Sequence, residues 1–200
     1  MLEEEYNPRR RLPRHLRPAP PEEPPFAFEV RDATERDIPD MLEIYNHYVT
    51  NSTVTFDEDP LTLAEMRTKF ANVQRLGYPW LVAESPSGQV LGYAYVTPWK
   101  PKAAYRFTVE NSIYLRSAAT GKGIGSALMR EMLAKAKAAG IREVVAVIAD
   151  RGAEASIAMH ERFGFQQIGH MGKVGFKFGR WLGTVLMQKS LKGRSGTGTP

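Results

Sequence analysis

A glycine-rich segment near residue 120 constrains the fold of this 200-residue chain more than any other feature. It separates a stretch that alternates like a strand from an amphipathic stretch typical of a helix. N–H groups at a helix start lack intrahelical partners, and glycines let an anion approach them closely. The alternative is a tight strand-to-helix turn without a ligand. The segment consists of Thr120, Gly121, Lys122, Gly123, Ile124, Gly125 and Ser126.

The spacing of these glycines excludes two familiar nucleotide loops. It is not the Gly-x-x-x-x-Gly-Lys-Ser/Thr of a P-loop, and no Gly-x-Gly-x-x-Gly follows the first strand of a nucleotide fold. A pyrophosphate still fits such a cradle, and Lys122 would add a positive charge beside it. The segment therefore predicts an anion site without naming the anion.

Hydrophobic residues predict one domain over residues 26–191 between two flexible tails. Residues 1–25 hold seven of the fourteen prolines and few aliphatic side chains, so they cannot offset the entropy of ordering. Residues 192–200 are rich in Gly, Ser and Thr and predict a second tail.

Hydrophobic periodicity predicts an α/β fold, a mixed twisted sheet of about seven strands flanked by about four helices on its two faces. Capping boxes, Thr34 with Asp37 and Thr62 with Glu65, open the first two helices. The expected order is strand, two helices, three strands, helix, strand, helix, two strands. Strands are expected over 26–30, 80–84, 89–97, 106–115, 143–149, 166–174 and 181–188, and helices over 38–49, 62–73, from 121–125 to about 139, and over 154–163.

The composition removes several classes of protein. The absence of cysteine excludes disulfides, thiolate zinc sites and a cysteine nucleophile, and we expect no metal. The net charge of +5 comes from scattered basic residues, which suit an anionic ligand better than nucleic acid. No apolar run approaches the roughly 18 to 20 residues of a membrane span, and no secretory signal is visible. We therefore expect a cytoplasmic protein without nucleic-acid or membrane partners.

Four sequence blocks between residues 31 and 191 carry a family resemblance. They are Asn-His-Tyr at 46–48 with Ser-Thr-Val-Thr-Phe at 52–56, Thr-Val-Glu-Asn-Ser-Ile-Tyr at 108–114, the loop at 121–126, and Met-His-Glu-Arg-Phe-Gly-Phe at 159–165. In this order they resemble the GNAT superfamily of N-acetyltransferases, in its phosphinothricin acetyltransferase-like branch. The resemblance implies a GNAT-like fold, acetyl-CoA as acetyl donor, a homodimer, and phosphinothricin, methionine sulfone or methionine sulfoximine as the amine.

The resemblance also assigns the cofactor site. It implies that residues 120–126 wrap the CoA pyrophosphate and that the backbone of Ile113, Tyr114 and Leu115 bonds the pantetheine arm. Two positions depart from the superfamily, with Thr120 in place of Gln or Arg and Ala153 in place of Asn. We expect either change to lower the affinity for CoA.

Direct attack of an amine on a thioester needs a base and a proton for the leaving thiolate, without a covalent enzyme intermediate. Glu110 is the candidate base, acting directly or through a water, because its strand leads into the glycine loop. By spacing alone it is equally an ordinary solvated carboxylate. His160, where most of the superfamily has tyrosine, is the candidate that protonates the thiolate or relays the amine proton. Its alternative is a packed helical histidine.

Three residues are candidates for the acceptor pocket. Arg106 is suited to clamping a substrate carboxylate, and Phe56 and Tyr105 to forming apolar walls. Their alternatives are a solvated arginine and ordinary core aromatics. Two other functions stay open, acetylation of a different amine (a polyamine, an aminoglycoside or a protein N-terminus) and acetyl-CoA binding without turnover.

Overall fold

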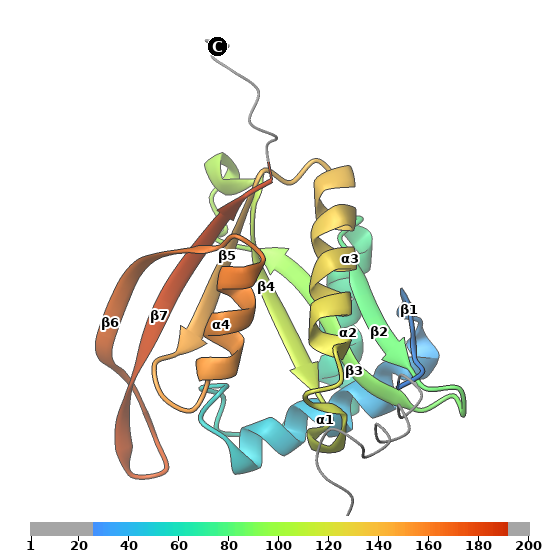
Figure 1. Cartoon of the computed structure of the whole chain (residues 1–200). Coiled ribbons are helices and arrows are strands. Elements are labelled where there is room, and N and C mark those ends of the chain that lie inside the picture. Colours follow the sequence, from blue (N-terminus) through green and yellow to red (C-terminus); the bar gives the residue numbers. More distant parts are fainter. Residues whose placement is uncertain (1–25, 192–200) are drawn as a thin grey trace, which may run out of the picture.

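The computed structural model describes residues 26–191, and its elements follow the expected order (Figure 1). The described residues form one seven-stranded sheet with the strand order β1-β2-β3-β4-β5-β7-β6. The predicted tails, 1–25 and 192–200, lie outside the described residues. The strands are β1 (Glu29–Asp32), β2 (Trp80–Glu84), β3 (Val90–Pro98), β4 (Thr108–Leu115), β5 (Glu143–Ala149), β6 (Gln166–Lys177) and β7 (Arg180–Ser190), and the α-helices are α1 (Ile38–Asn51), α2 (Leu63–Arg75), α3 (Ile124–Ala138) and α4 (Glu154–Arg162).

Local turns shift two of the predicted strand boundaries. β4 begins at Thr108 and not at 106, because a short 3-10 helix (Ala103–Tyr105) precedes it. The N–H of Arg106 donates to the carbonyl of Ala103 at 3.1 Å, which keeps Arg106 in this turn. β6 and β7 are longer than predicted, since they continue to a tight turn at Phe178 and Gly179, both with positive φ.

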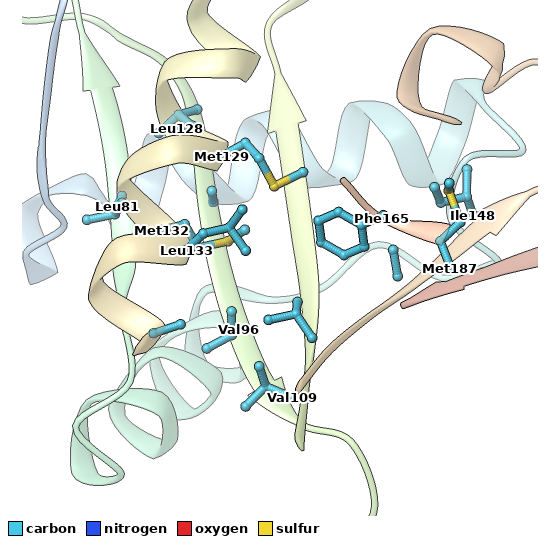
Figure 2. Packing of buried hydrophobic residues seen from close by; sticks show 14 of the residues in the cluster. Leu81, Val96, Val109, Leu128, Met129, Met132, Leu133, Ile148, Phe165 and Met187 are labelled. Carbon is cyan, nitrogen blue, oxygen red and sulfur yellow. The ribbon is translucent and has the colours of Figure 1, made fainter. Parts of the chain in front are cut away.

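The sheet is covered on both faces, and each face has its own core. Figure 1 shows α3 and α4 on one face and α1 and α2 on the other. Residues of α3 pack on β2, β3, β4 and β5 in the first core, part of which is drawn in Figure 2. Each fully buried Leu or Met there contributes roughly 1.5 to 3 kcal/mol of transfer free energy. The second core joins α1 and α2 to the aromatic residues Trp80, Tyr93 and Tyr95.

The helices are amphipathic and short. The longest α-helix that the structure describes is α3, with 15 residues. Between residues 26 and 191 no helix combines the length and the apolar character needed to cross a membrane.

The central strands separate part-way along their length. All neighbouring strands pair antiparallel except β4 and β5, which run parallel. β4 and β5 pair only at residues 108–110 with 143–145, so they part beyond Glu110 and Val145. A parted pair leaves backbone groups and side chains free to line a cleft at the middle of the sheet.

Candidate active site

Two adjoining cavities open where β4 and β5 part. The larger, of about 610 Å³, is bounded by residues 120–126, the end of β4 and the start of α4, and we call it the loop cavity. The smaller, of about 240 Å³, lies between β4 and β5, and we call it the strand cavity. Val54, Ile113 and Ser156 line both cavities. A long ligand in the loop cavity can therefore reach into the strand cavity.

The glycine loop forms one end of the loop cavity. Gly121 and Gly123 have φ of +75° and +82°, a left-handed backbone that costs other residues about 1 to 2 kcal/mol. α3 begins directly afterwards, and its first N–H groups have no intrahelical partner. No acidic side chain stands in the first turn of α3 to compete for these donors. The loop thus offers an anion cradle of backbone N–H groups and a helix N-terminus.

The predicted cofactor residues divide between the two cavities. Ile113, Leu115, Thr120, Gly121, Gly123, Ile124, Gly125 and Ser126 line the loop cavity. Tyr114 lines the strand cavity, and its ring packs edge-on against Tyr45 at a centroid distance of 5.2 Å. Lys122 lines neither cavity, since its Nζ lies 4.1 Å from the ring centroid of Phe26. The lining of the loop cavity at this end therefore comes from the neighbours of Lys122, and the contribution of its charge stays a prediction.

Thr120 and Ala153, the two residues that depart from the superfamily pattern, both line the loop cavity. Thr120 lines the cavity and its hydroxyl donates to the carbonyl of Ser117 at 2.9 Å, which closes the turn before the loop. Ala153 is buried and precedes α4 without a side-chain cap. Both leave space at the cavity wall and supply no charged or amide group.

β4 presents different residues to its two faces. Side chains alternate along a strand, and the register with β3 is regular over the whole of β4. Val109, Ile113 and Leu115 face the first core, on the α3 side. Tyr114 packs with the second core, on the α1 side, and Glu110 shares its parity. Glu110 and Asn111 therefore stand on opposite faces of the strand at the point where the cleft begins.

Glu110 has the surroundings of a base held above its ordinary pKa. It is half-buried and lines the strand cavity. Burial raises the pKa of the Glu110 carboxyl, and the nearby positive charges of Lys100 and Lys69 oppose this in part. A carboxylate with a raised pKa takes up a proton more readily than a solvated one.

His160 is buried beside Asn111 and uses both ring nitrogens. Its Nδ1 lies 2.8 Å from the carbonyl oxygen of Ser156, and its Nε2 lies 3.0 Å from Nδ2 of Asn111. The ring also packs edge-on against Phe165 at 4.8 Å. Burial lowers the pKa of His160, so the imidazole is neutral at neutral pH. The histidine is thus packed and oriented by its neighbours, and its role in proton transfer stays a prediction.

Two buried polar atoms of the strand cavity have no hydrogen-bond partner among the described residues. They are Oδ1 of Asn111 and Oγ1 of Thr184. The sequence analysis missed both residues. Strand alternation was the signal for Asn111, because it puts residue 111 opposite the candidate base. Thr184 arrives from β7, far away in the sequence, and no local pattern marks it.

Phe56 lines the strand cavity and is held there by the β6–β7 hairpin. Gly175 of β6 lies so close that a Cβ atom on it would meet Cδ2 of Phe56 at 2.5 Å. Lys177 is buried, and its Nζ donates to the carbonyls of Ser52 at 3.0 Å and Thr55 at 2.8 Å. The hairpin therefore fixes the segment that carries Phe56, a link that the sequence did not reveal.

Arg106 and Tyr105 line neither cavity. The guanidinium of Arg106 stacks over the ring of Phe107 at 4.6 Å, and its Nη1 donates to the carbonyl of Ala103 at 3.2 Å. Tyr105 is exposed. The predicted strand began at Arg106 and put its side chain on the face of Glu110, whereas the short 3-10 helix before β4 keeps Arg106 in a turn. Within a single chain, neither contributes to the pocket that holds Glu110.

The site joins an anion cradle to a buried carboxylate through one continuous cleft. Among residues 26–191 no group of three or more His, Asp or Glu side chains is placed to hold a metal ion. A family model described as "Acetyltransferase (GNAT) domain" matches residues 30–186. The chain belongs to the GNAT acetyltransferase family. It is an N-acetyltransferase that uses acetyl-CoA, as the sequence predicted.

Relatives with named activities fall in the predicted branch. The chain is 43% identical over 165 residues to phosphinothricin N-acetyltransferase of Alcaligenes faecalis, which covers 82% of this chain and 83% of the relative. It is 44% identical over 166 residues to L-methionine sulfoximine/L-methionine sulfone acetyltransferase of Pseudomonas aeruginosa, covering 83% and 96%. These matches confirm the phosphinothricin acetyltransferase-like resemblance.

A solved structure supports both the fold and the cofactor. The chain is similar, with a TM-score of 0.81 and 42% identity, to a GNAT superfamily phosphinothricin acetyltransferase from Sinorhizobium meliloti in complex with acetyl-CoA. The match covers 86% of this chain and 93% of that one. The predicted GNAT-like fold is thereby confirmed. The loop cavity fits acetyl-CoA, because it offers backbone donors for phosphates and the edge of β4 for an amide-bearing arm.

Proposed function

We propose that this acetyltransferase acetylates the amine of a small amino-acid analogue such as phosphinothricin, methionine sulfone or methionine sulfoximine, with Glu110 as the base. The amine nitrogen attacks the thioester carbon directly, the C–S bond breaks, and the thiolate leaves. Glu110 takes the amine proton, directly or through one water. The observation that carries this proposal is the half-buried carboxylate at the inner end of a cleft whose outer end is formed by a glycine loop and a helix N-terminus.

In the same proposal, each remaining cofactor residue acts through its backbone or its shape. Residues 120–126 hold the pyrophosphate, and the backbone of Ile113, Tyr114 and Leu115 bonds the pantetheine arm. Phe56 supplies an apolar wall to the acceptor side chain, which the hairpin contact of Gly175 supports. Lys69 and Lys100, whose positive charges act on Glu110, draw the substrate carboxylate toward the strand cavity.

The test measures acetyl-CoA turnover by thiol release with phosphinothricin, methionine sulfone, methionine sulfoximine and a panel of unrelated amines. The wild-type chain is compared with Glu110→Gln and, as a control, Glu131→Gln on the exposed face of α3. Loss of a general base costs about 10²- to 10⁴-fold in rate. We expect that loss in kcat for Glu110→Gln, unchanged acetyl-CoA binding, and a control within twofold of wild type.

The pH dependence follows from the same carboxylate. A base works only when ionised, so kcat/KM falls as the pH drops through the pKa of Glu110. Because burial raises that pKa, the acidic limb lies above the value of about 4.3 for an ordinary glutamate. Glu110→Gln lacks this limb. A wild-type rate that stays flat down to pH 4, or a limb kept in the variant, contradicts the assignment.

Failure of the amino-acid analogues alone leads to a different conclusion from failure of all amines. Turnover of a polyamine, an aminoglycoside or a protein N-terminus in their place would keep the base and change the substrate. Acetyl-CoA binding without turnover of any amine would contradict the proposed acetylation of these amines and favour a domain that binds the cofactor without turnover.

We also propose that the protein is a homodimer and works in the cytoplasm, where acetyl-CoA is available. The hairpin supports the dimer, since it exposes large apolar side chains that a second copy would cover. Light scattering should give twice the chain mass for the wild type and the chain mass for Trp181→Glu. In a dimer, Arg106 and Tyr105 remain candidates for the partner's pocket. The exposed side chains are Ile168, Met171, Val174, Phe176, Phe178 and Trp181.

A further inference from the structure

The buried pair of Asn111 and His160 fixes the direction of one amide group. A carbonyl oxygen only accepts, so the short contact of His160 Nδ1 with the Ser156 carbonyl places the ring hydrogen on Nδ1. The neutral ring then carries a lone pair on Nε2, to which Nδ2 of Asn111 donates at 3.0 Å. Oδ1 of Asn111 consequently points away from the histidine.

None of the described residues donates a hydrogen bond to this Oδ1. Asn111 is 7% exposed, and its Oδ1 has no partner among them. A buried polar atom without a partner costs about 1 to 3 kcal/mol. The residue lines the strand cavity, together with Glu110 and His160. A group with a free N–H or O–H in that cavity would remove the cost.

Asn111 stands at the inner end of the cleft. It is the first residue of β4 beyond the last β4–β5 pair, which joins Glu110 to Val145. Along β4 it comes before Ile113 and Leu115, which line the loop cavity, and its side chain is on their face of the strand. Glu110 is its neighbour on the other face. Both side chains nevertheless line the strand cavity between β4 and β5, where the reacting nitrogen has to sit.

We propose that Asn111 is a further catalytic residue, whose Oδ1 accepts an N–H of the reacting amine, and that His160 is the positioning residue that orients it. This inference rests on the proposed function. A neutral primary amine has two N–H bonds and one lone pair. One N–H gives its proton to Glu110, and the other donates a hydrogen bond to Oδ1 of Asn111. The lone pair of the nitrogen then faces the thioester carbon.

The kinetic test uses Asn111→Leu, Asn111→Asp and His160→Gln beside the wild type. We expect Asn111→Leu to lower kcat/KM for the amine about 10- to 100-fold, with the KM for acetyl-CoA within twofold of wild type. Asn111→Asp keeps an acceptor oxygen and should recover part of that loss. His160→Gln should lower kcat/KM less than Asn111→Leu, because Asn111 is still present but no longer oriented. Melting temperature and acetyl-CoA binding show that each variant is folded.

Nitrogen NMR of the His160 ring tests the orientation without turnover. The wild type should show a neutral ring with its hydrogen on Nδ1 at pH 7, and Asn111→Asp should show hydrogens on both nitrogens, because a carboxylate then faces Nε2. A wild-type ring with its hydrogen on Nε2 would mean that Oδ1 of Asn111 accepts from His160 and that Nδ2 faces the cavity. That result would overturn the proposal.

The remaining outcomes separate this inference from the proposed function. Unchanged amine kinetics in a folded Asn111→Leu overturn the inference and leave the proposed function in place. A rise confined to the KM for acetyl-CoA assigns Oδ1 to an amide of the cofactor arm and also overturns it. A wild type that acetylates no amine in the panel removes the proposed function first, and the inference with it.

Discussion

The loop cavity and the strand cavity are built in opposite ways. The loop cavity takes half of its lining residues from one continuous stretch, from the end of β4 through residues 120–126 into α3, and most of the others from residues 152–162. The strand cavity is lined by residues 54–56, 110–114 and 146–149, with two residues from α4 and one from β7. One cavity offers backbone groups that follow from local conformation. The other offers side chains that only the folded sheet brings together.

This difference predicts how the two cavities respond to change. A substitution that alters backbone conformation in the glycine loop should affect acetyl-CoA and leave the amine alone. A substitution in the distant β6–β7 hairpin should do the reverse, because the hairpin holds the segment that carries Phe56.

The largest loss of stability is expected for Lys177→Met. Lys177 is buried and donates to two carbonyls of the segment before and around Phe56, and methionine leaves both without a partner. We expect a loss of about 1 to 3 kcal/mol in the free energy of unfolding and a several-fold rise in KM for the amine. Denaturant unfolding and steady-state kinetics measure both. Lys173→Met, exposed on the same hairpin, is the control. An equal rise in KM for acetyl-CoA would show that the two cavities do not respond independently.

A smaller loss of stability is expected for Gly123→Ala in the glycine loop. Its φ of +82° makes any Cβ cost about 1 to 2 kcal/mol, and the strain falls on the anion cradle. Gly140→Ala, at the other end of the same helix with φ of +85°, carries the same strain far from the cradle. Both variants should lose similar stability. Only Gly123→Ala should weaken acetyl-CoA binding, by about tenfold, as measured by calorimetry. Equal binding in the two variants would show that the loop backbone is not the cradle.

The smallest effect is expected for Gly175→Ala. The added methyl group meets the Phe56 ring at 2.5 Å and pushes it toward the strand cavity. We expect a change of a few-fold in KM for amines with long side chains and little change for short ones, at unchanged KM for acetyl-CoA. Gly169→Ala on the same strand, where the nearest atom is 3.8 Å away, should leave both constants unaltered. Equal shifts for long and short amines would mean that Phe56 does not set the acceptor size.

The candidate site was predictable from sequence to the extent that it is local. The glycine loop follows from the residues between a strand and a helix, and Glu110 follows from the alternation of β4. The same alternation did not extend to Arg106, because the 3-10 helix before β4 ends the strand at Thr108. Lys122 carries the expected charge, but its long side chain lies against Phe26.

By itself, the sequence determined the element order, the two-faced sheet and the glycine loop between strand and helix, because hydrophobic period, capping residues and glycines act within a few residues. The family followed from the resemblance of four sequence blocks and was confirmed by the family model. Only the tertiary structure decided the acceptor side. Three features decide it: the parting of β4 and β5, the contact of Asn111 with His160, and the segment around Phe56 held by Lys177 and Gly175. They involve residues that are 35 to 125 positions apart. Such contacts form only when the whole sheet has folded, and no local pattern encodes them.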